Sequence, residues 1–140
     1  MIPYHGTPLG GVQMYRPKFL QGRHALVSFA DLEDLQLVAE CCQTWVIDNV
    51  AFTAWKSGNP VKDWTPYYEF CKQWLRHPGC DWCIIPDVID GDEGTNDQAI
   101  VNFVNWIGWR GERWHLNTKA VPVWHLHESI ERLTRLANGW

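Results

Sequence analysis

The sequence predicts an α/β fold with a parallel β-sheet. Three short apolar runs, at residues 44–49, 82–87 and 121–128, each end abruptly in charged or polar residues. Runs of this kind are typical of strands that are buried on both faces, as in a parallel sheet. Segments with apolar residues at helical spacing follow the strands, so β and α elements alternate along the chain.

Four strand–helix units, over residues 23–140, are expected after an irregular entry segment, residues 1–22, that is rich in glycine and proline. The predicted strands are residues 24–30, 44–51, 81–87 and 120–126. The predicted helices begin at the capping residues Asp31, Asp63 or Thr65, Thr95 and Ser129, and end near residues 42, 76, 109 and 137. Residues 110–111 would end the third helix, and residues 112–119 would form a polar connector.

The 140 residues fit a single α/β domain. Parallel strands with right-handed crossovers fit either a small open sheet or half of a TIM-type (β/α)8 barrel. A half barrel leaves two sheet edges without partners. A homodimer or a second chain is therefore expected to complete the barrel.

Composition disfavours several classes of protein. The net charge is −4, and no cluster of lysine and arginine gives the broad footprint of a nucleic-acid-binding protein. No apolar stretch approaches the roughly 18 residues of a membrane span, and no leader sequence is visible, so a cytoplasmic protein without membrane contact is expected. The motifs of serine hydrolases, P-loop NTPases and dinucleotide-binding dehydrogenases are missing.

Polar residues follow the predicted strands directly, and parallel strands would gather them on one rim. Asp48 and Asn49 follow one strand, Asp87 the next, and His125 and His127 the last. A carboxylate at the end of a buried strand is poorly solvated, which raises its pKa toward the range useful for proton transfer. Asp48 is therefore a candidate catalytic residue, with the capping of a helix as the alternative.

Three further features could contribute to this rim. Asp90 and Asp92 share an acidic loop with Asp87, which suits a divalent cation, the N–H groups of a polar ring, or a solvated turn. The pair His125 and His127 could contact a ligand, bind zinc with a carboxylate, or serve structure alone. His5 lies in a loop that could fold against the same rim.

No metal or cofactor is predicted. The pair Cys80 and Cys83 has CxxC spacing, but no second pair completes a zinc site, so a packing role is expected. The ten tryptophans indicate an aromatic core. Trp55 and Trp124 lie nearest the strand ends and are candidates for stacking on a planar ligand.

Five segments of the chain resemble a family of phage and prophage proteins. That family is related to the tRNA-guanine transglycosylases and to phage DNA-modifying 7-deazaguanine transglycosylases. The resemblance extends over nearly the whole chain and is carried by residues 4–8, 27–30, 47–52, 85–92 and 122–128, of which the Pro-Asp-Val-Ile-Asp-Gly-Asp segment is the most specific.

The resemblance implies the N-terminal half of a (β/α)8 barrel that exchanges bases on a ribose or deoxyribose. Asp48 and Phe52 match the Asp and Phe of the family motif Asp-Ser-Gly-Gly-Phe, and its two glycines are replaced here. In the family this aspartate acts in proton transfer, and a second one, matched by Asp87, recognises the base. The nucleophile and the zinc site of the family come from later strands, beyond this chain.

Three functions remain open from the sequence. The first is a transglycosylase-like domain that binds a nucleobase or nucleic acid, with 7-deazaguanine as one candidate base, in the cytoplasm of the host if a phage encodes it. The second is a non-catalytic phage accessory or inhibitor protein that binds a host protein or a nucleotide. The third is a small metal-dependent hydrolase that uses His125, His127 and Asp87.

Overall fold

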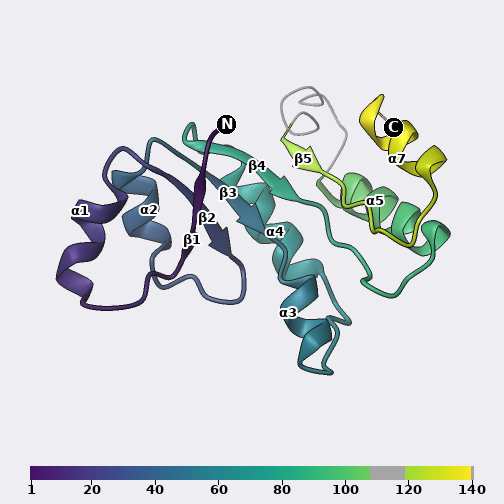
Figure 1. The fold of residues 1–140 in the computed structure, drawn as a ribbon, viewed down its shortest axis with the longest axis horizontal. Helices are drawn as coiled ribbons and strands as arrows, with labels where there is room; N and C mark the ends of the chain where they lie inside the picture. The colour runs from purple at the N-terminus through teal and green to yellow at the C-terminus, as the bar shows by residue number, and fades with distance from the viewer. Residues whose placement is uncertain (108–118, 140) are drawn as a thin grey trace.

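A computed structural model describes residues 1–107 and 119–139 and confirms an α/β fold with an open, all-parallel sheet. The elements are β1 (Tyr4–Thr7), η1 (Gln13–Tyr15), α1 (Arg16–Leu20), β2 (His24–Ser28), α2 (Leu35–Cys41), β3 (Thr44–Asp48), α3 (Ala51–Lys56), α4 (Thr65–Trp74), β4 (Cys80–Ile84), α5 (Glu93–Ile107), β5 (Ala120–Val121) and α7 (Ile130–Ala137). Figure 1 shows α1 and α2 at the left end of the view, α5 and α7 at the right end, and α3 projecting beyond the strand ends.

The five strands follow one another in chain order, β1-β2-β3-β4-β5, and every neighbouring pair is parallel. Because each crossover advances in the same direction, right-handed connections place the helices on one face of the sheet. A doubly wound sheet would reverse its strand order and carry helices on both faces. The winding is therefore the one that the strands of a (β/α)8 barrel follow.

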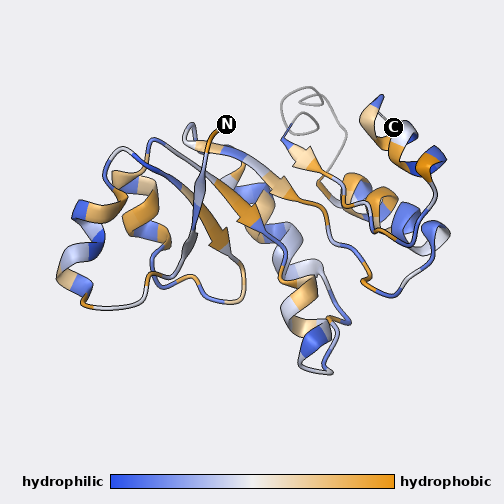
Figure 2. Cartoon of the chain, viewed as in Figure 1, coloured by the Kyte–Doolittle hydropathy of each residue, from blue (hydrophilic) through white to orange (hydrophobic). Residues whose placement is uncertain are grey.

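The core lies between the sheet and this helical layer. In β2, Ala25 and Val27 are fully buried, whereas the alternate residues are only partly buried. The buried apolar cluster consists of Leu20, Ala25, Val27, Val38, Trp45, Ile47, Tyr67, Tyr68, Cys71, Leu75, Cys80, Cys83, Ile85, Ile100, Phe103 and Ile107. Figure 2 shows the central strands as strongly hydrophobic segments, in agreement with strands that are covered by helices.

The entry segment is more regular than the sequence predicts. It contributes β1, so there are five strands instead of four, and its helical turns η1 and α1 lead into β2. β1 is only four residues long and includes Gly6, so it lacks the apolar run by which the other strands are recognised. Asp34 holds the segment in place, because its carboxylate accepts a hydrogen bond from the Leu9 amide at 2.7 Å and pairs with Arg16 at 2.8 Å.

All four predicted strands end earlier than expected, and β2 and β4 end at Ser28 and Ile84 instead of residues 30 and 87. β3 ends at Asp48 instead of residue 51, and a short helix, α3, follows it where a strand end and a loop were expected. β5 comprises only two residues, because Pro122 has no N–H to donate to a sheet ladder. The expected helix end at residues 108–111 and the connector at residues 112–118 lie outside the described residues.

Helix capping is partly as predicted. The Ser129 side chain accepts a hydrogen bond from the Arg132 amide and caps α7, which ends before Asn138. Asp92, and not Thr95, caps α5, because its carboxylate accepts the Thr95 amide at 2.7 Å. No helix in the described ranges has the length and apolar character needed to cross a membrane.

The buried hydroxyl of Tyr67 fixes α4 to the carboxyl end of β4. It donates a 2.6 Å hydrogen bond to the Ile84 carbonyl, and the Tyr67 side chain is almost fully buried. We expect Tyr67→Phe to lower the free energy of unfolding by about 1 kcal/mol, since it leaves a hydrogen bond unmade. Urea unfolding measures this change.

Tyr68→Phe is the matched control. Tyr68 is the next residue of the same helix, it is also buried, and its hydroxyl bonds no described residue. Its substitution should leave the unfolding free energy nearly unchanged, and equal effects of the two substitutions would contradict the role of the Tyr67 hydroxyl.

Candidate functional site

Asn49 connects the carboxyl ends of two adjacent strands. Its side-chain amide donates hydrogen bonds to the Ile85 carbonyl at 2.8 Å and to Asp87 Oδ1 at 2.7 Å, and its Oδ1 accepts the Ala51 amide at 2.9 Å. Asn49 is buried, so these bonds are protected from competition by water. The residue both starts α3 and orients the carboxylate of Asp87.

Asp87 lies between Asn49 and His125. It is only 8% exposed, and its Oδ2 is 3.1 Å from His125 Nε2. Burial raises the pKa of Asp87, and the hydrogen bond from Asn49 and the nearby imidazole lower it without cancelling that effect. The Nε2 atom of His125 is buried and faces this carboxylate, so His125 and Asn49 hold Asp87 from two sides.

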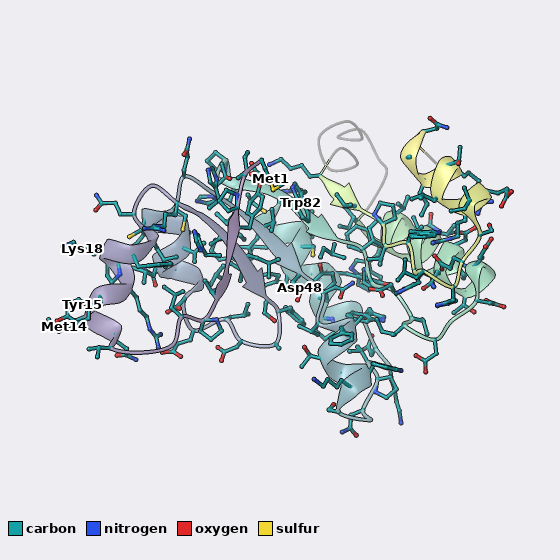
Figure 3. All side chains as sticks on the ribbon, in the orientation of Figure 1. Met1, Met14, Tyr15, Lys18, Asp48 and Trp82 are labelled. Carbon is teal, nitrogen blue, oxygen red and sulfur yellow. The ribbon has the colours of Figure 1, made fainter. Side chains whose placement is uncertain are left out.

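Asp48 ends β3 and lies near the start of α3 (Figure 3). Burial raises the pKa of Asp48, and the charge of Asp87 raises it further, against backbone hydrogen bonds from Asn49 and Val50. Two carboxylates with raised pKa values thus lie close to each other, which is typical of sites that transfer protons. We refer to Asp48, Asn49, Asp87 and His125 as the polar rim.

Val50 adopts a left-handed backbone conformation next to the rim. Its φ is 65° and its ψ is 5°, and it is the only non-glycine residue with positive φ in the described part of the chain. This conformation is costly for a β-branched side chain, because the Cβ crowds the backbone. Such strain is commonly found at functional sites, where surrounding contacts maintain it.

A buried ionic cluster supports the rim from the side of α5 and α7. Glu128 accepts hydrogen bonds from the His125 amide at 2.8 Å, from Asn96 at 2.9 Å and from Arg132 at 2.5 Å. Although burial raises the pKa of Glu128, these bonds outweigh it and leave the pKa lowered. Asn96 also pairs with the backbone of Val88, so the loops after β4 and β5 are held together.

The two histidines stack instead of converging. The rings of His125 and His127 are 5.5 Å apart at an interplanar angle of 13°, and His127 Nε2 lies 3.0 Å from the Gly91 carbonyl. Among the described residues, no group of three or more histidine, cysteine or acidic side chains is arranged to hold a metal ion. Cys80 and Cys83 are free and buried in the core.

The other predicted residues lie around the rim or away from it. Phe52 is exposed on α3, whereas the Trp124 indole donates to the Ser129 carbonyl at 3.0 Å and fixes the last loop. Asp92 caps α5, and Asp90 is exposed in the loop before it. His5 packs edge-on against Phe19 at 5.1 Å, so the structure does not bring it to the rim.

Sequence reasoning missed Asn96 and Arg132. A signal for Asn96 exists, because it has helical spacing with the buried residues Ile100, Phe103 and Ile107. A polar residue on such a stripe must find a buried partner. For Arg132 no comparable signal stands out.

Comparison with known proteins does not assign the chain to a family. No family model matches it, and neither the curated proteins nor the solved structures include a significant match. What the rim can do is therefore judged from its own side chains.

We expect Val50→Gly to raise the free energy of unfolding by about 1 kcal/mol. Glycine adopts the left-handed conformation without strain. The free energy gained in this way exceeds the cost of the extra conformational entropy that glycine gives to the unfolded chain. Thermal unfolding measures the change, and Val50→Ala is the control because it shortens the side chain but keeps the Cβ. No gain from glycine over alanine would show that position 50 is not strained.

Asp48→Asn should stabilise the fold at pH 7. Because the pKa of Asp48 is raised in the folded state, its carboxyl group stabilises the fold while it is protonated. This contribution is lost as pH rises through the raised pKa, and the ionised carboxylate is destabilising at pH 7. The advantage of the variant should therefore shrink as pH falls through the raised pKa to the ordinary aspartate value. Urea unfolding at several pH values measures this.

Asp92→Asn provides a control of opposite sign. Hydrogen bonds from Thr95 lower the pKa of Asp92, so this variant should be less stable than the wild type at pH 7. The same sign for both variants would contradict the environment described for Asp48.

Proposed function

We propose that the chain is a transglycosylase-like domain that binds a planar nitrogenous base at the polar rim. The observation that carries this proposal is the buried carboxylate of Asp87, held between Asn49 and His125 beside Asp48. The rim lies at the carboxyl ends of parallel strands, where α/β proteins bind ligands.

The rim has the chemistry needed for such a ligand. A fixed carboxylate accepts hydrogen bonds from adjacent ring and exocyclic N–H groups, as on the edge of a guanine-like base. His125 holds this carboxylate in place, and Asp48, with its raised pKa, is suited to moving a proton. No metal is required for these contacts.

The conformation of Val50 supports the resemblance to transglycosylases. Val50 stands at the first of the two positions where the family motif has glycine, and its φ of 65° is one that glycine adopts without strain. A sharp turn directly after the strand that ends at Asp48 would explain both why the family has glycine at this position and why Val50 is strained in this chain.

Base exchange itself would require more strands than the five described here. The resemblance places the nucleophilic aspartate on a later strand of an eight-stranded barrel. Two copies of this sheet would supply ten strands, so simple doubling does not close such a barrel. A further segment or a different chain with three strands fits better than a homodimer, and the cytoplasm of a phage-infected cell is the expected location.

A second function, binding of a host protein without catalysis, is favoured by one observation. The η1–α1 segment exposes Val12, Met14 and Tyr15, at 60%, 73% and 62%. Exposed apolar residues of this kind are typical of surfaces that contact other proteins. Failure of the chain to bind any base would favour this function.

We expect Asp87→Asn to weaken the binding of guanine or 7-deazaguanine by at least about ten-fold, since hydrogen bonds to a charged group contribute about 1.5–3 kcal/mol. Isothermal titration calorimetry measures the affinity. Asp90→Asn, in the same loop but exposed, is the control and should bind like the wild type. Equal affinities for all three proteins would refute the base site.

A further inference from the structure

We propose that the projecting segment of residues 51–62, which we call the α3 arm, binds single-stranded nucleic acid next to the polar rim. The proposal rests on the proposed function only in taking the rim as the site of one base. It adds the surface that would hold the neighbouring nucleotides.

The α3 arm presents two aromatic rings to solvent. Phe52 is 58% exposed and Trp55 is 42% exposed, and their ring centroids are 5.8 Å apart at an interplanar angle of 36°. Both belong to one face of α3, since they are three residues apart. Large aromatic rings that remain exposed in adjacent positions are suited to stacking with bases, because every base has a planar face.

The α3 arm is positively charged and is therefore complementary to a phosphate backbone. Residues 51–62 include Lys56 and Lys62 and no acidic residue, although the whole chain has a net charge of −4. Both lysines are exposed. Cations beside stacking rings are the combination that single-strand-binding proteins use.

The position of the arm connects it to the rim. α3 begins at Ala51, whose amide is bonded to Asn49 of the rim, and the helix extends beyond the strand ends in Figure 1. A strand that places one base at Asp87 would therefore pass the arm. The acidic residues Asp90 and Asp92 belong to the loop between β4 and α5, whereas the arm has no acidic residue, which favours a path over the arm.

A single strand fits this surface better than a duplex. Stacking on Phe52 and Trp55 requires bases that are not already stacked in a helix. A duplex would offer only its phosphates, and two lysines form too small a cationic surface for strong duplex binding.

The test measures the binding of labelled single strands of about 12 nucleotides, a typical site length, by fluorescence anisotropy. The strands are oligo-dT and oligo-U. The variant Trp55→Ala/Lys56→Glu is compared with the wild type and with Tyr15→Ala/Lys18→Glu. The control pair changes charge and aromatic content equally and lies on the η1–α1 segment, apart from the α3 arm in Figure 3.

We expect the α3-arm variant to bind at least about ten-fold more weakly than the wild type, from the loss of one stacking ring and one cation. The control should stay within about two-fold, an affinity change small on the scale of one stacked base. Absence of binding by the wild type, equal affinity for a duplex, or equal losses in both variants would overturn the proposal.

Two further measurements keep the outcome clear. Photocrosslinking of the wild-type protein to a strand containing iodouracil should label a peptide within residues 51–62, and labelling elsewhere alone would overturn the proposal. Free guanine should bind the α3-arm variant normally, whereas Asp87→Asn should lose free guanine and keep contact with the strand. The arm and the base site can therefore fail separately.

Discussion

The hydrogen bonds of Asn49 are the interaction on which the site depends. One buried amide joins the ends of β3 and β4, starts α3 and fixes the carboxylate of Asp87. Parallel pairing of β3 and β4 is what brings these groups to the same edge of the sheet. An antiparallel arrangement would place them at opposite ends, and neither the paired carboxylates nor their raised pKa values would exist.

The two sides of the rim are held in different ways. On the side of β3, a strained residue, Val50, and one amide redirect the chain into the α3 arm. On the side of β5, Glu128 and Arg132 form a buried pair that fixes the backbone of His125. A buried pair contributes little to stability overall, but removal of one partner is costly, so it suits a role in holding one geometry. The rim is thus rigid on both sides of Asp87.

Much of the fold could be predicted because its central strands are apolar runs that end in polar residues. The same pattern located Asp48, Asn49, Asp87 and His125, three of which the structure brings into direct contact. β1 gives no periodic signal because it has only four residues, one of them glycine, and β5 is shorter than predicted because Pro122 has no N–H for the sheet ladder. The start of α3 and the position of His5 depend on tertiary contacts, which the periodicity of the sequence does not report.

The most direct test is a double-mutant cycle on the free energy of unfolding, with Asn49→Ala, Asp87→Ala and both substitutions together. If Asn49 holds the carboxylate at a shared rim, the two residues are coupled by at least about 1 kcal/mol, as for hydrogen-bonded neighbours in a buried network. Additive effects, within about 0.5 kcal/mol, would show that the two strand ends do not meet and would contradict the site.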